Sequence, residues 1–238
     1  MTENLHLSAS HLLWSVIDWI YPPVCCGCGQ DGHDICPECQ TSLQRPGADI
    51  CQKCGKTLDP LDGCLTCGAV LASYDAARAA FFYEGTIREA IHQLKFNGNL
   101  GISRLLSKML FSVYLMQKWQ PDLVTAVPLT KRHLNERGFN QSNWLAAPIA
   151  RLVGLKFLKG ALQKTLDTET QVGLDHTQRF ENLKGAFQAE PVLVKGKSIL
   201  LIDDVMTTGA TFNECAKTLK QAGAKKVYCL SVATTRPI

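Results

Sequence analysis

Two adjacent carboxylates, Asp203 and Asp204, are the side chains in this sequence best placed to do chemistry. They directly follow a run of apolar residues, Ile199 to Ile202, that no polar residue interrupts. Such a run is typical of a strand that is covered on both faces of a parallel sheet. We therefore expect the acid pair at the carboxyl edge of that sheet, where open α/β sheets bind their ligands. Neighbouring carboxylates suit a diol or a divalent cation.

A polar segment with one glycine follows the acid pair and leads into a helix that we expect over residues 212–221. The backbone N–H groups at a helix N-terminus are free to bind an anion, and threonine hydroxyls add further donors. The segment therefore suits a phosphate, and a sugar phosphate would satisfy both the segment and the acid pair. Its residues are Thr207, Thr208, Gly209, Ala210 and Thr211.

The stretch from Lys197 to Thr211 closely resembles the signature of type I phosphoribosyltransferases, which bind phosphoribosyl pyrophosphate (PRPP). The resemblance implies that Asp203 and Asp204 hold the ribose hydroxyls, as the catalytic pair of an active enzyme, and that residues 207–211 hold the 5′-phosphate. The stretch does not follow the Gly-x-x-x-x-Gly-Lys-Ser/Thr pattern of a Walker loop. The alternative is a buried strand with two solvated aspartates and an ordinary capped helix.

A second group of charged residues follows another expected strand, over residues 123–127. Three cations, Lys131, Arg132 and Arg137, lie in a segment that we expect to be a loop at the same sheet edge as the acid pair. That density of positive charge suits pyrophosphate, whereas the alternative is a solvated basic loop, the usual fate of a charge run. Pro148 lies inside the helical pattern that follows and should kink or break that helix.

The polar segment from Thr165 to Thr177 lacks clear periodicity, and we expect it to be mobile. Over an active site, such a segment commonly acts as a lid that excludes water. Gln171, Arg179 and Asn182 are candidates for contact with the ligand, and Arg179 adds positive charge to the expected PRPP site.

Eleven cysteines are present, and eight of them form Cys-x-x-Cys pairs before residue 68. Thiolates at this spacing bind one ion from a tight turn, which indicates metal sites and a reducing compartment rather than disulfides. Iron–sulfur ligation, interleaved pairs, one occupied site, and Cys26 in place of Cys25 remain open alternatives. The simplest arrangement is two consecutive structural Zn²⁺ sites, formed by Cys25, Cys28, Cys36 and Cys39 and by Cys51, Cys54, Cys64 and Cys67.

The remaining periodic segments predict an α/β domain. Apolar residues of the helix expected before Gly98 share one face, whereas Lys95 projects elsewhere. The residues on that face are Ile87, Ala90, Ile91 and Leu94. Further strands are expected over 76–83, 156–164 and 226–233, and a further helix over 102–118. The fold that the phosphoribosyltransferase resemblance implies is a mostly parallel sheet flanked by helices, with a small N-terminal zinc-ribbon module.

We expect an N-terminal amphipathic helix within residues 1–24, the zinc-ribbon module over 25–68 and the phosphoribosyltransferase-like domain over 69–238. No basic segment precedes the first apolar residues, so no signal peptide is expected, and no segment is apolar enough to span a bilayer. We therefore expect a cytoplasmic protein. The 46% hydrophobic content is typical of a globular protein, and the net charge of +4 is too weak to indicate nucleic acid by itself.

Further motifs accompany the acid pair in a fixed order, including Lys95-Phe96-Asn97-Gly98 and Arg137-Gly138-Phe139-Asn140-Gln141. With these motifs and the cysteine pairs in front, the chain is similar to the ComF competence proteins essentially from end to end. The resemblance implies a phosphoribosyltransferase domain fused to a zinc ribbon, Mg²⁺ bound together with PRPP, and a role in DNA uptake or processing during bacterial natural transformation.

Three functions remain open on this resemblance. The chain could bind PRPP and handle incoming single-stranded DNA, with Phe96, Phe139 and Trp144 as stacking platforms. It could be an active phosphoribosyltransferase for a base or an amine; no hood follows the last strand, so residues 84–118 or the zinc module would have to cover the site. It could also be a PRPP sensor that contacts a helicase or a recombination protein. We favour the first function.

Overall fold

The structure is a computed structural model that describes residues 23–69, 72–167 and 176–236. The predicted N-terminal helix and the central part of the predicted lid, with Gln171, lie outside the described residues. Among the described residues, no helix has the length and hydropathy that a bilayer crossing requires.

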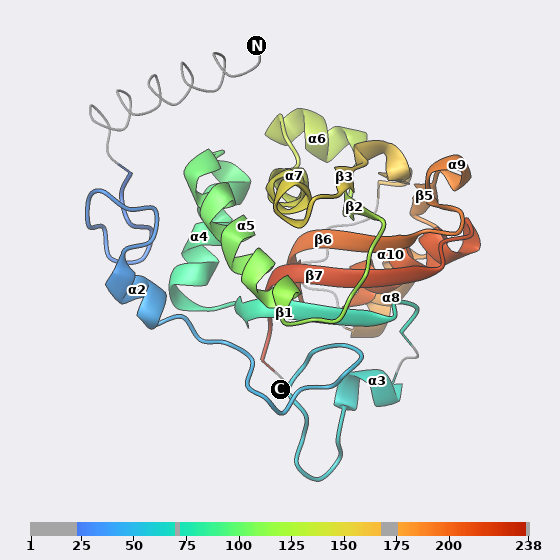
Figure 1. Cartoon of the computed structure of the whole chain (residues 1–238), viewed down its shortest axis with the longest axis horizontal. Helices are drawn as coiled ribbons and strands as arrows, with labels where there is room; N and C mark the ends of the chain where they lie inside the picture. Colours follow the sequence, from blue (N-terminus) through green and yellow to red (C-terminus); the bar gives the residue numbers. More distant parts are fainter. Residues whose placement is uncertain (1–22, 70–71, 168–175, 237–238) are drawn as a thin grey trace.

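Five parallel strands form the central sheet, so the mostly parallel sheet expected from the sequence is confirmed. Their order across the sheet is β1, β7, β6, β2 and β3 (Figure 1). The last strand of the chain therefore lies inside the sheet, between the strand that carries the acid pair and the first strand. The bounds are β1 Ala76–Phe82, β2 Leu123–Ala126, β3 Lys156–Phe157, β6 Ser198–Met206 and β7 Lys226–Thr234.

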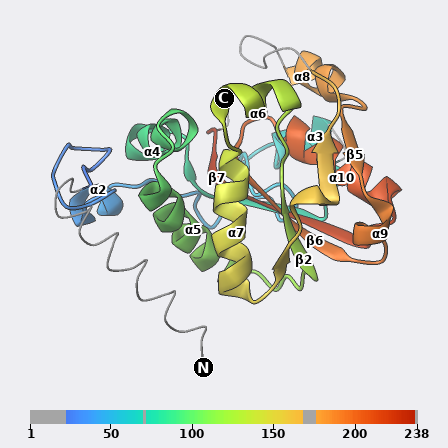
Figure 2. The ribbon, with the colours of Figure 1, turned by 90° about the horizontal axis from the view of Figure 1, so that it is seen from above.

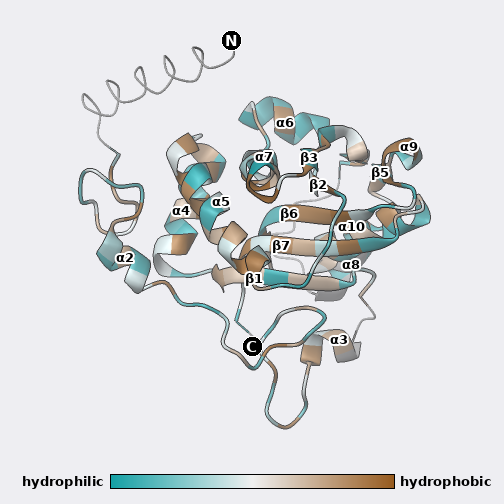
Figure 3. Cartoon of the chain, viewed as in Figure 1, coloured by the Kyte–Doolittle hydropathy of each residue, from teal (hydrophilic) through white to brown (hydrophobic). Residues whose placement is uncertain are grey.

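Helices cover both faces of this sheet. Successive residues of β6 point to opposite faces, and the apolar residues on both faces are buried. Leu200 and Ile202 belong to the core under α4, α5 and α7, whereas Ile199 and Leu201 belong to the core under α10 (Figures 2 and 3). The bounds of these helices are α4 Gly85–Phe96, α5 Leu100–Leu115, α7 Gln141–Val153 and α10 Ala210–Gln221.

One predicted strand is wrong in its extent. The segment 156–164 is not a single strand, because the chain leaves the sheet after β3, makes a short 3₁₀ turn over Lys159–Ala161 and then enters β4. Strand β4 pairs antiparallel with β5 in a separate two-stranded sheet. The remaining elements on this side are β4 Leu162–Lys164, α8 His176–Leu183, β5 Phe187–Ala189 and α9 Pro191–Val194.

The predicted basic loop after β2 is instead the helix α6, Lys131–Arg137. The hydroxyl oxygen of Thr130 accepts a hydrogen bond from the backbone N–H of His133 at 3.2 Å, which caps the helix, and Gly138 ends it in a left-handed conformation. The following helix, α7, is not broken at Pro148, because residues on both sides of the proline remain helical.

The cysteine-rich segment packs along the α/β domain and contains the short helices α2, Pro37–Thr41, and α3, Leu65–Ala69 (Figure 1). Its second half lies against β1, where the backbone N–H of Ala77 donates to the carbonyl oxygen of Lys53 at 2.6 Å. Gly55 adopts φ +70° there, and a β-carbon at this position would overlap the carbonyl oxygen of Ala77. Glycine is therefore required by both the turn and the close approach.

Candidate functional site

A cavity of about 640 Å³ opens at the carboxyl ends of β2 and β6. It brings together most of the residues that the sequence analysis selected, because these strand ends meet at one edge of the sheet. The selected residues that line it are Arg137, Asp203, Asp204, Thr207, Gly209, Ala210 and Thr211. Other elements complete the wall with Tyr83, Lys95, Phe96, His133, Ser142 and Lys164.

The acid pair is nearly buried, with 8% of Asp203 and 4% of Asp204 exposed. The hydroxyl of Ser142, in the first turn of α7, donates to Oδ1 of Asp203 at 2.8 Å. The backbone N–H of Asp204 donates to the same oxygen at 2.9 Å. On Asp204, Oδ2 forms an ion pair with Nζ of Lys95 at 2.9 Å, and Oδ1 accepts from the backbone N–H of Val205 at 2.7 Å. Each carboxylate is therefore held in place by a different helix.

The pKa values of Asp203 and Lys95 are both shifted from their usual range. Burial, and then the neighbouring charge of Asp204, raise the pKa of Asp203 to about 7, and the hydrogen bond from Ser142 opposes this rise. Burial is the largest single influence on Lys95 and lowers its pKa, but the contacts with Asp204 and the charge of Asp203 act together in the opposite direction, and the pKa of Lys95 is raised. The arrangement therefore favours the charged form of Lys95 and disfavours the charged form of Asp203.

Replacing Ser142 by alanine is expected to raise the pKa of Asp203 further, because the substitution removes a donor that favours the carboxylate form. A hydrogen bond to a charged group contributes about 1.5 kcal/mol, which corresponds to a rise of about one pH unit. Carbon-13 NMR titration of the aspartate carboxyl groups would measure it. The control is Ser107→Ala, since the Ser107 hydroxyl donates only to backbone carbonyls among the described residues. An unchanged titration of Asp203 in Ser142→Ala would contradict the prediction.

The segment after the acid pair turns sharply into α10. Gly209, with φ +82°, is the residue that caps the helix N-terminus, and the cavity reaches it and the first helical residues, Ala210 and Thr211. Free backbone N–H groups at this end of a twelve-residue helix favour an anion. Thr208 is not among the residues that line this cavity, and it lines a small pocket beside the second half of the cysteine-rich segment. Its hydroxyl oxygen accepts from the backbone N–H of Ala210 at 3.3 Å.

The predicted basic residues separate into two groups. Arg137 lines the cavity, donates to Oε1 of Gln141, and stacks over the ring of Phe96 at 5.5 Å. Lys131 and Arg132 are exposed on α6 and are not among the residues that line the cavity.

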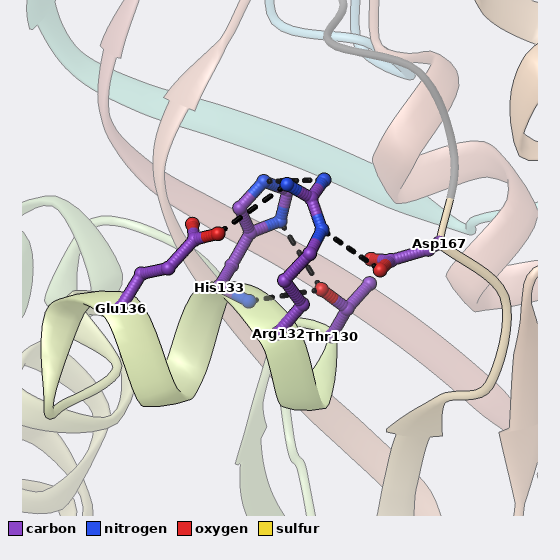
Figure 4. A network of polar contacts seen from close by, with 5 residues as sticks. All are labelled: Thr130, Arg132, His133, Glu136 and Asp167. Carbon is purple, nitrogen blue, oxygen red and sulfur yellow. Dashed lines mark hydrogen bonds and ion pairs between the residues drawn. The ribbon is translucent and has the colours of Figure 1, made fainter.

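Arg132 is already paired with two acids (Figure 4). Its Nε donates to Asp167 at 2.9 Å, and its guanidinium contacts Glu136 at 3.3 Å. Arg179 and Asn182 lie in α8, and the side chain of Arg179 is outside what the structure describes. The described residues thus leave the predicted roles of these two positions open.

Lys95 and Ser142 were not among the site residues expected from the sequence. The expectation that Lys95 projects away from the buried face of α4 is wrong, because its side chain is mostly buried against Asp204. Lys95 is four residues after the buried Ile91, and this helical spacing could have placed it on the same face. Ser142 gave no comparable local signal, because its contact with Asp203 joins distant segments.

Of the three aromatic residues predicted as stacking platforms, Phe96 lines the cavity, whereas Phe139 and Trp144 lie beside Gly98. Phe139 and Trp144 stack on each other with ring centroids 4.0 Å apart, and Trp144 also packs against the core. Phe96 is 63% exposed and lies against His92. Among the three predicted stacking platforms, Phe96 therefore offers the most open ring.

The cysteines form two groups of four, and within each group all sulfur atoms lie within 4.8 Å of one another. The groups are consecutive along the chain: Cys25, Cys28, Cys36 and Cys39, and Cys51, Cys54, Cys64 and Cys67. Cys26 lies outside both groups, and its thiol is directed to the backbone oxygen of Thr86 in α4.

The spacing of the sulfur atoms fits a tetrahedral Zn²⁺ site. At Zn–S distances of about 2.3 Å, neighbouring sulfurs of such a site lie about 3.8 Å apart. The Sγ atoms of Cys51 and Cys67 are 3.8 Å apart, and those of Cys28 and Cys36 are 3.6 Å apart. Each group therefore offers a closed set of four thiol ligands.

Comparisons with known proteins cover both halves of the chain. Residues 16–71 match the family described as "Double zinc ribbon domain", and residues 144–237 match "Phosphoribosyl transferase domain". "DNA utilization protein YhgH" of Escherichia coli (strain K12) is 34% identical over 210 residues, which cover 84% of this chain and 91% of that protein. "Competence protein F" of Haemophilus influenzae is 26% identical over 223 residues, which cover 83% of this chain and 96% of that protein.

Among solved structures, glutamine PRPP amidotransferase from B. subtilis, complexed with ADP and GMP, matches with a TM-score of 0.39 and 22% identity. This match covers 56% of the present chain and 27% of the other. The family matches agree with the architecture described above, in which cysteine groups precede a parallel sheet flanked by helices.

Proposed function

Because this chain belongs to the ComF family of competence and DNA-utilization proteins, we propose that it binds PRPP in its cavity and handles single-stranded DNA in the bacterial cytoplasm. One observation carries the first part of this proposal. Asp203 and Asp204 line the same cavity as the N-terminus of α10, so the groups proposed for the diol and for the phosphate share one space.

Each part of PRPP has a matching group in the cavity. The carboxylates of Asp203 and Asp204 accept hydrogen bonds from the ribose hydroxyls. The backbone N–H groups around Gly209 and the side chains of Thr207 and Thr211 bind the 5′-phosphate. Arg137, on the α6 side, provides positive charge for the pyrophosphate.

Mg²⁺ fits this site only together with the ligand. Among the described residues, groups of three or more metal-binding side chains occur at the cysteines alone, so the acid pair offers few protein ligands. Mg²⁺ prefers octahedral oxygen coordination and commonly takes part of it from substrate phosphates. When bound, the ion would neutralise pyrophosphate charge, and Asp203 and Asp204 are the residues of this chain that would contribute oxygens.

Calorimetric titration with PRPP and Mg²⁺ tests the proposal directly. Binding is expected at one site per chain, with ribose 5-phosphate as a competitor. Ribose lacking the 5′-phosphate should bind far more weakly, because the N-terminus of α10 would lose its anion. Absence of heat with PRPP, in a protein that is folded by circular dichroism, would contradict the proposed site.

We also propose that each group of four cysteines binds one structural Zn²⁺ ion. The closed set of thiol ligands, with sulfur spacings close to those of a tetrahedral site, supports zinc in a structural role. The cysteine-rich segment has a small apolar core, and metal binding would supply much of its folding free energy.

The surface of α6 supports DNA binding next to the cavity. Lys131 and Arg132 are exposed there, and Arg137 of the same helix lies over the exposed ring of Phe96 at the cavity. Single strands are commonly bound by a basic surface with aromatic rings on which bases stack. The names of the relatives, which refer to competence and DNA utilization, agree with this role.

Replacing Lys131 and Arg132 together by alanine is expected to lower the affinity for single-stranded DNA. It should also make that affinity less dependent on the salt concentration. Each lost phosphate contact lowers the slope of log affinity against log salt by about 0.7, so two contacts lower it by about 1.4. PRPP affinity is expected to stay unchanged, because neither side chain lines the cavity. Fluorescence anisotropy of a labelled oligonucleotide over a series of salt concentrations measures the slope.

The matched control replaces Lys225 and Lys226, two exposed cations at the amino end of β7, on the opposite edge of the sheet from the cavity. This variant should bind DNA like the wild type. Equal slopes for both double variants would show that α6 does not contact DNA.

An active phosphoribosyltransferase is the second candidate. Helix α4 supplies a partial hood, because Lys95 and Phe96 line the cavity on the side away from α10. Such a wall excludes water from a reacting ribose. Release of pyrophosphate from PRPP in the presence of a base or an amine would support this function, whereas binding without turnover would favour a PRPP-sensing partner of a helicase or a recombination protein.

A further inference from the structure

Among the residues that the structure describes, Lys95 is the cationic side chain that forms an ion pair with the acid pair. It lies in the last turn of α4, and its Nζ is 2.9 Å from Oδ2 of Asp204. Its side chain is 25% exposed, whereas that of Asp204 is 6% exposed, so the ion pair lies at the inner wall of the cavity. The positive charge of Lys95 thus comes from α4, whereas the rest of the proposed sugar-phosphate site is formed by β6, the turn after it and α10.

The acid pair needs a positive partner. Two adjacent carboxylates that are almost fully buried repel each other, and burial penalises both charges. Without a cation, such a pair keeps a proton or recruits a metal ion. A protonated carboxyl is a poorer acceptor for the hydroxyls of a ribose than a carboxylate is.

Lys95 also occupies part of the space that a metal ion would use. Its ammonium already contacts Oδ2 of Asp204, and Oδ1 of that residue accepts a backbone hydrogen bond. In the absence of a pyrophosphate ligand, Mg²⁺ at the acid pair would have to displace this ammonium and would still lack most of its oxygen ligands. A lysine, by contrast, supplies one positive charge without a coordination requirement.

We propose that Lys95 is the resident counter-cation of Asp203 and Asp204, so that the site binds phosphorylated pentoses with a free diol without a divalent cation. Mg²⁺ is then required only for ligands that carry a pyrophosphate. This inference rests on the proposed function, since it concerns how the same cavity binds its sugar. The ligand class that we infer is the pentose 5-monophosphates, which would bind to groups of the protein without a metal ion.

The test compares ribose 5-phosphate binding with and without Mg²⁺ by calorimetry. Divalent cations are removed from buffer and ligand with a chelating resin, because a chelator in solution would compete for structural zinc. The wild-type affinities with and without Mg²⁺ are expected to agree within about threefold, whereas PRPP should bind at least about tenfold more tightly with Mg²⁺. This comparison needs no variant.

The variant Lys95→Met keeps the length of the side chain and removes its charge. Without Mg²⁺ it is expected to bind ribose 5-phosphate at least about tenfold more weakly than the wild type, because the acid pair loses its countercharge. Addition of Mg²⁺ should restore part of the affinity. Lys95→Arg should retain metal-independent binding, and Lys108→Met, which changes an exposed lysine of α5, should behave like the wild type.

Direct binding of Mn²⁺ as a probe, followed by electron paramagnetic resonance without any sugar, gives a second measurement. Lys95→Met is expected to bind Mn²⁺ more tightly than the wild type, because the unpaired carboxylates become available.

The possible failures are distinguishable. Binding of ribose 5-phosphate to the wild type that requires Mg²⁺, or equal affinities of Lys95→Met and wild type, would overturn the role of Lys95 and leave PRPP binding intact. Absence of binding of both PRPP and ribose 5-phosphate to the wild type would overturn the proposed function and this inference together.

Discussion

A protein in which Asp203 and Asp204 are both replaced by asparagine is expected to bind PRPP at least about a hundredfold more weakly than the wild type. A hydrogen bond from a ribose hydroxyl to a carboxylate contributes about 1.5 to 3 kcal/mol, and each 1.4 kcal/mol corresponds to about a tenfold change in affinity. The substitutions also leave the ammonium of Lys95 in the cavity without its carboxylate partner. Calorimetry with PRPP and Mg²⁺ measures the loss.

The fold should survive this change, because asparagine has the shape of aspartate and the exchange removes two charges that burial disfavours. Thermal unfolding by circular dichroism checks that point. The matched control is Asp49→Asn with Asp62→Asn, the same chemical change at two exposed positions of the cysteine-rich segment. A folded acid-pair variant that binds PRPP as tightly as this control would remove the basis for the site.

Replacing Cys51 and Cys54 by serine is expected to halve the zinc content of the protein, from two ions to one, and to unfold the second half of the cysteine-rich segment. Binding of a structural zinc ion contributes about 10 to 16 kcal/mol in small zinc-binding peptides, more than the apolar contacts of such a segment provide. Cys54 is fully buried in the core that also contains residues of α10. Elemental analysis and thermal unfolding measure the two effects.

Unfolding of the second half of the cysteine-rich segment is also expected to weaken the proposed phosphate site. The backbone N–H of Ser73 donates to Oδ1 of Asn213 at 2.7 Å, and Thr66 and Cys67 border the small pocket that Thr208 and Gly209 also line. Unfolding this half would remove support from the turn that begins α10, and PRPP affinity should fall.

Replacement of Cys36 and Cys39 by serine is the comparison at the other cysteine group, which packs on α4 and α5 and away from this turn. It should lower the zinc content equally and affect PRPP binding less. The control is Cys26→Ser, because this cysteine belongs to neither group. Zinc content that stays at two ions after the loss of Cys51 and Cys54 would show that these residues are not ligands.

Local features of this protein could be predicted from the sequence because their signals lie within a few residues. The apolar run before Asp203, the glycine and threonines that follow, and the helix after them are contiguous, so their order alone predicted a buried strand and a helix N-terminus. The Cys-x-x-Cys spacing likewise predicted that the thiols gather in pairs. The parallel sheet was expected from the uninterrupted apolar run Ile199 to Ile202 and from the resemblance to phosphoribosyltransferases.

Features that join distant segments could not be predicted in this way. The segment 156–164 divides between two sheets, because Lys156 and Phe157 pair with β2 whereas Leu162–Lys164 pair with β5. This outcome depends on which strands lie beside the segment in three dimensions. The helix α6 is a different case, because its caps, Thr130 and Gly138, lie directly beside it in the sequence and are a local signal for a helix.

The sequence already established which chemical groups are present and how they are spaced: paired acids, a threonine-rich turn and regularly spaced thiols. Tertiary structure alone decided their partners, since Lys95 meets Asp204 and Ser142 meets Asp203 only after α4 and α7 pack on the same face of the sheet. The physical reason is that charge and hydrogen-bonding capacity belong to a side chain, whereas pKa and ligand affinity depend on the atoms that folding brings within about 3 Å of it.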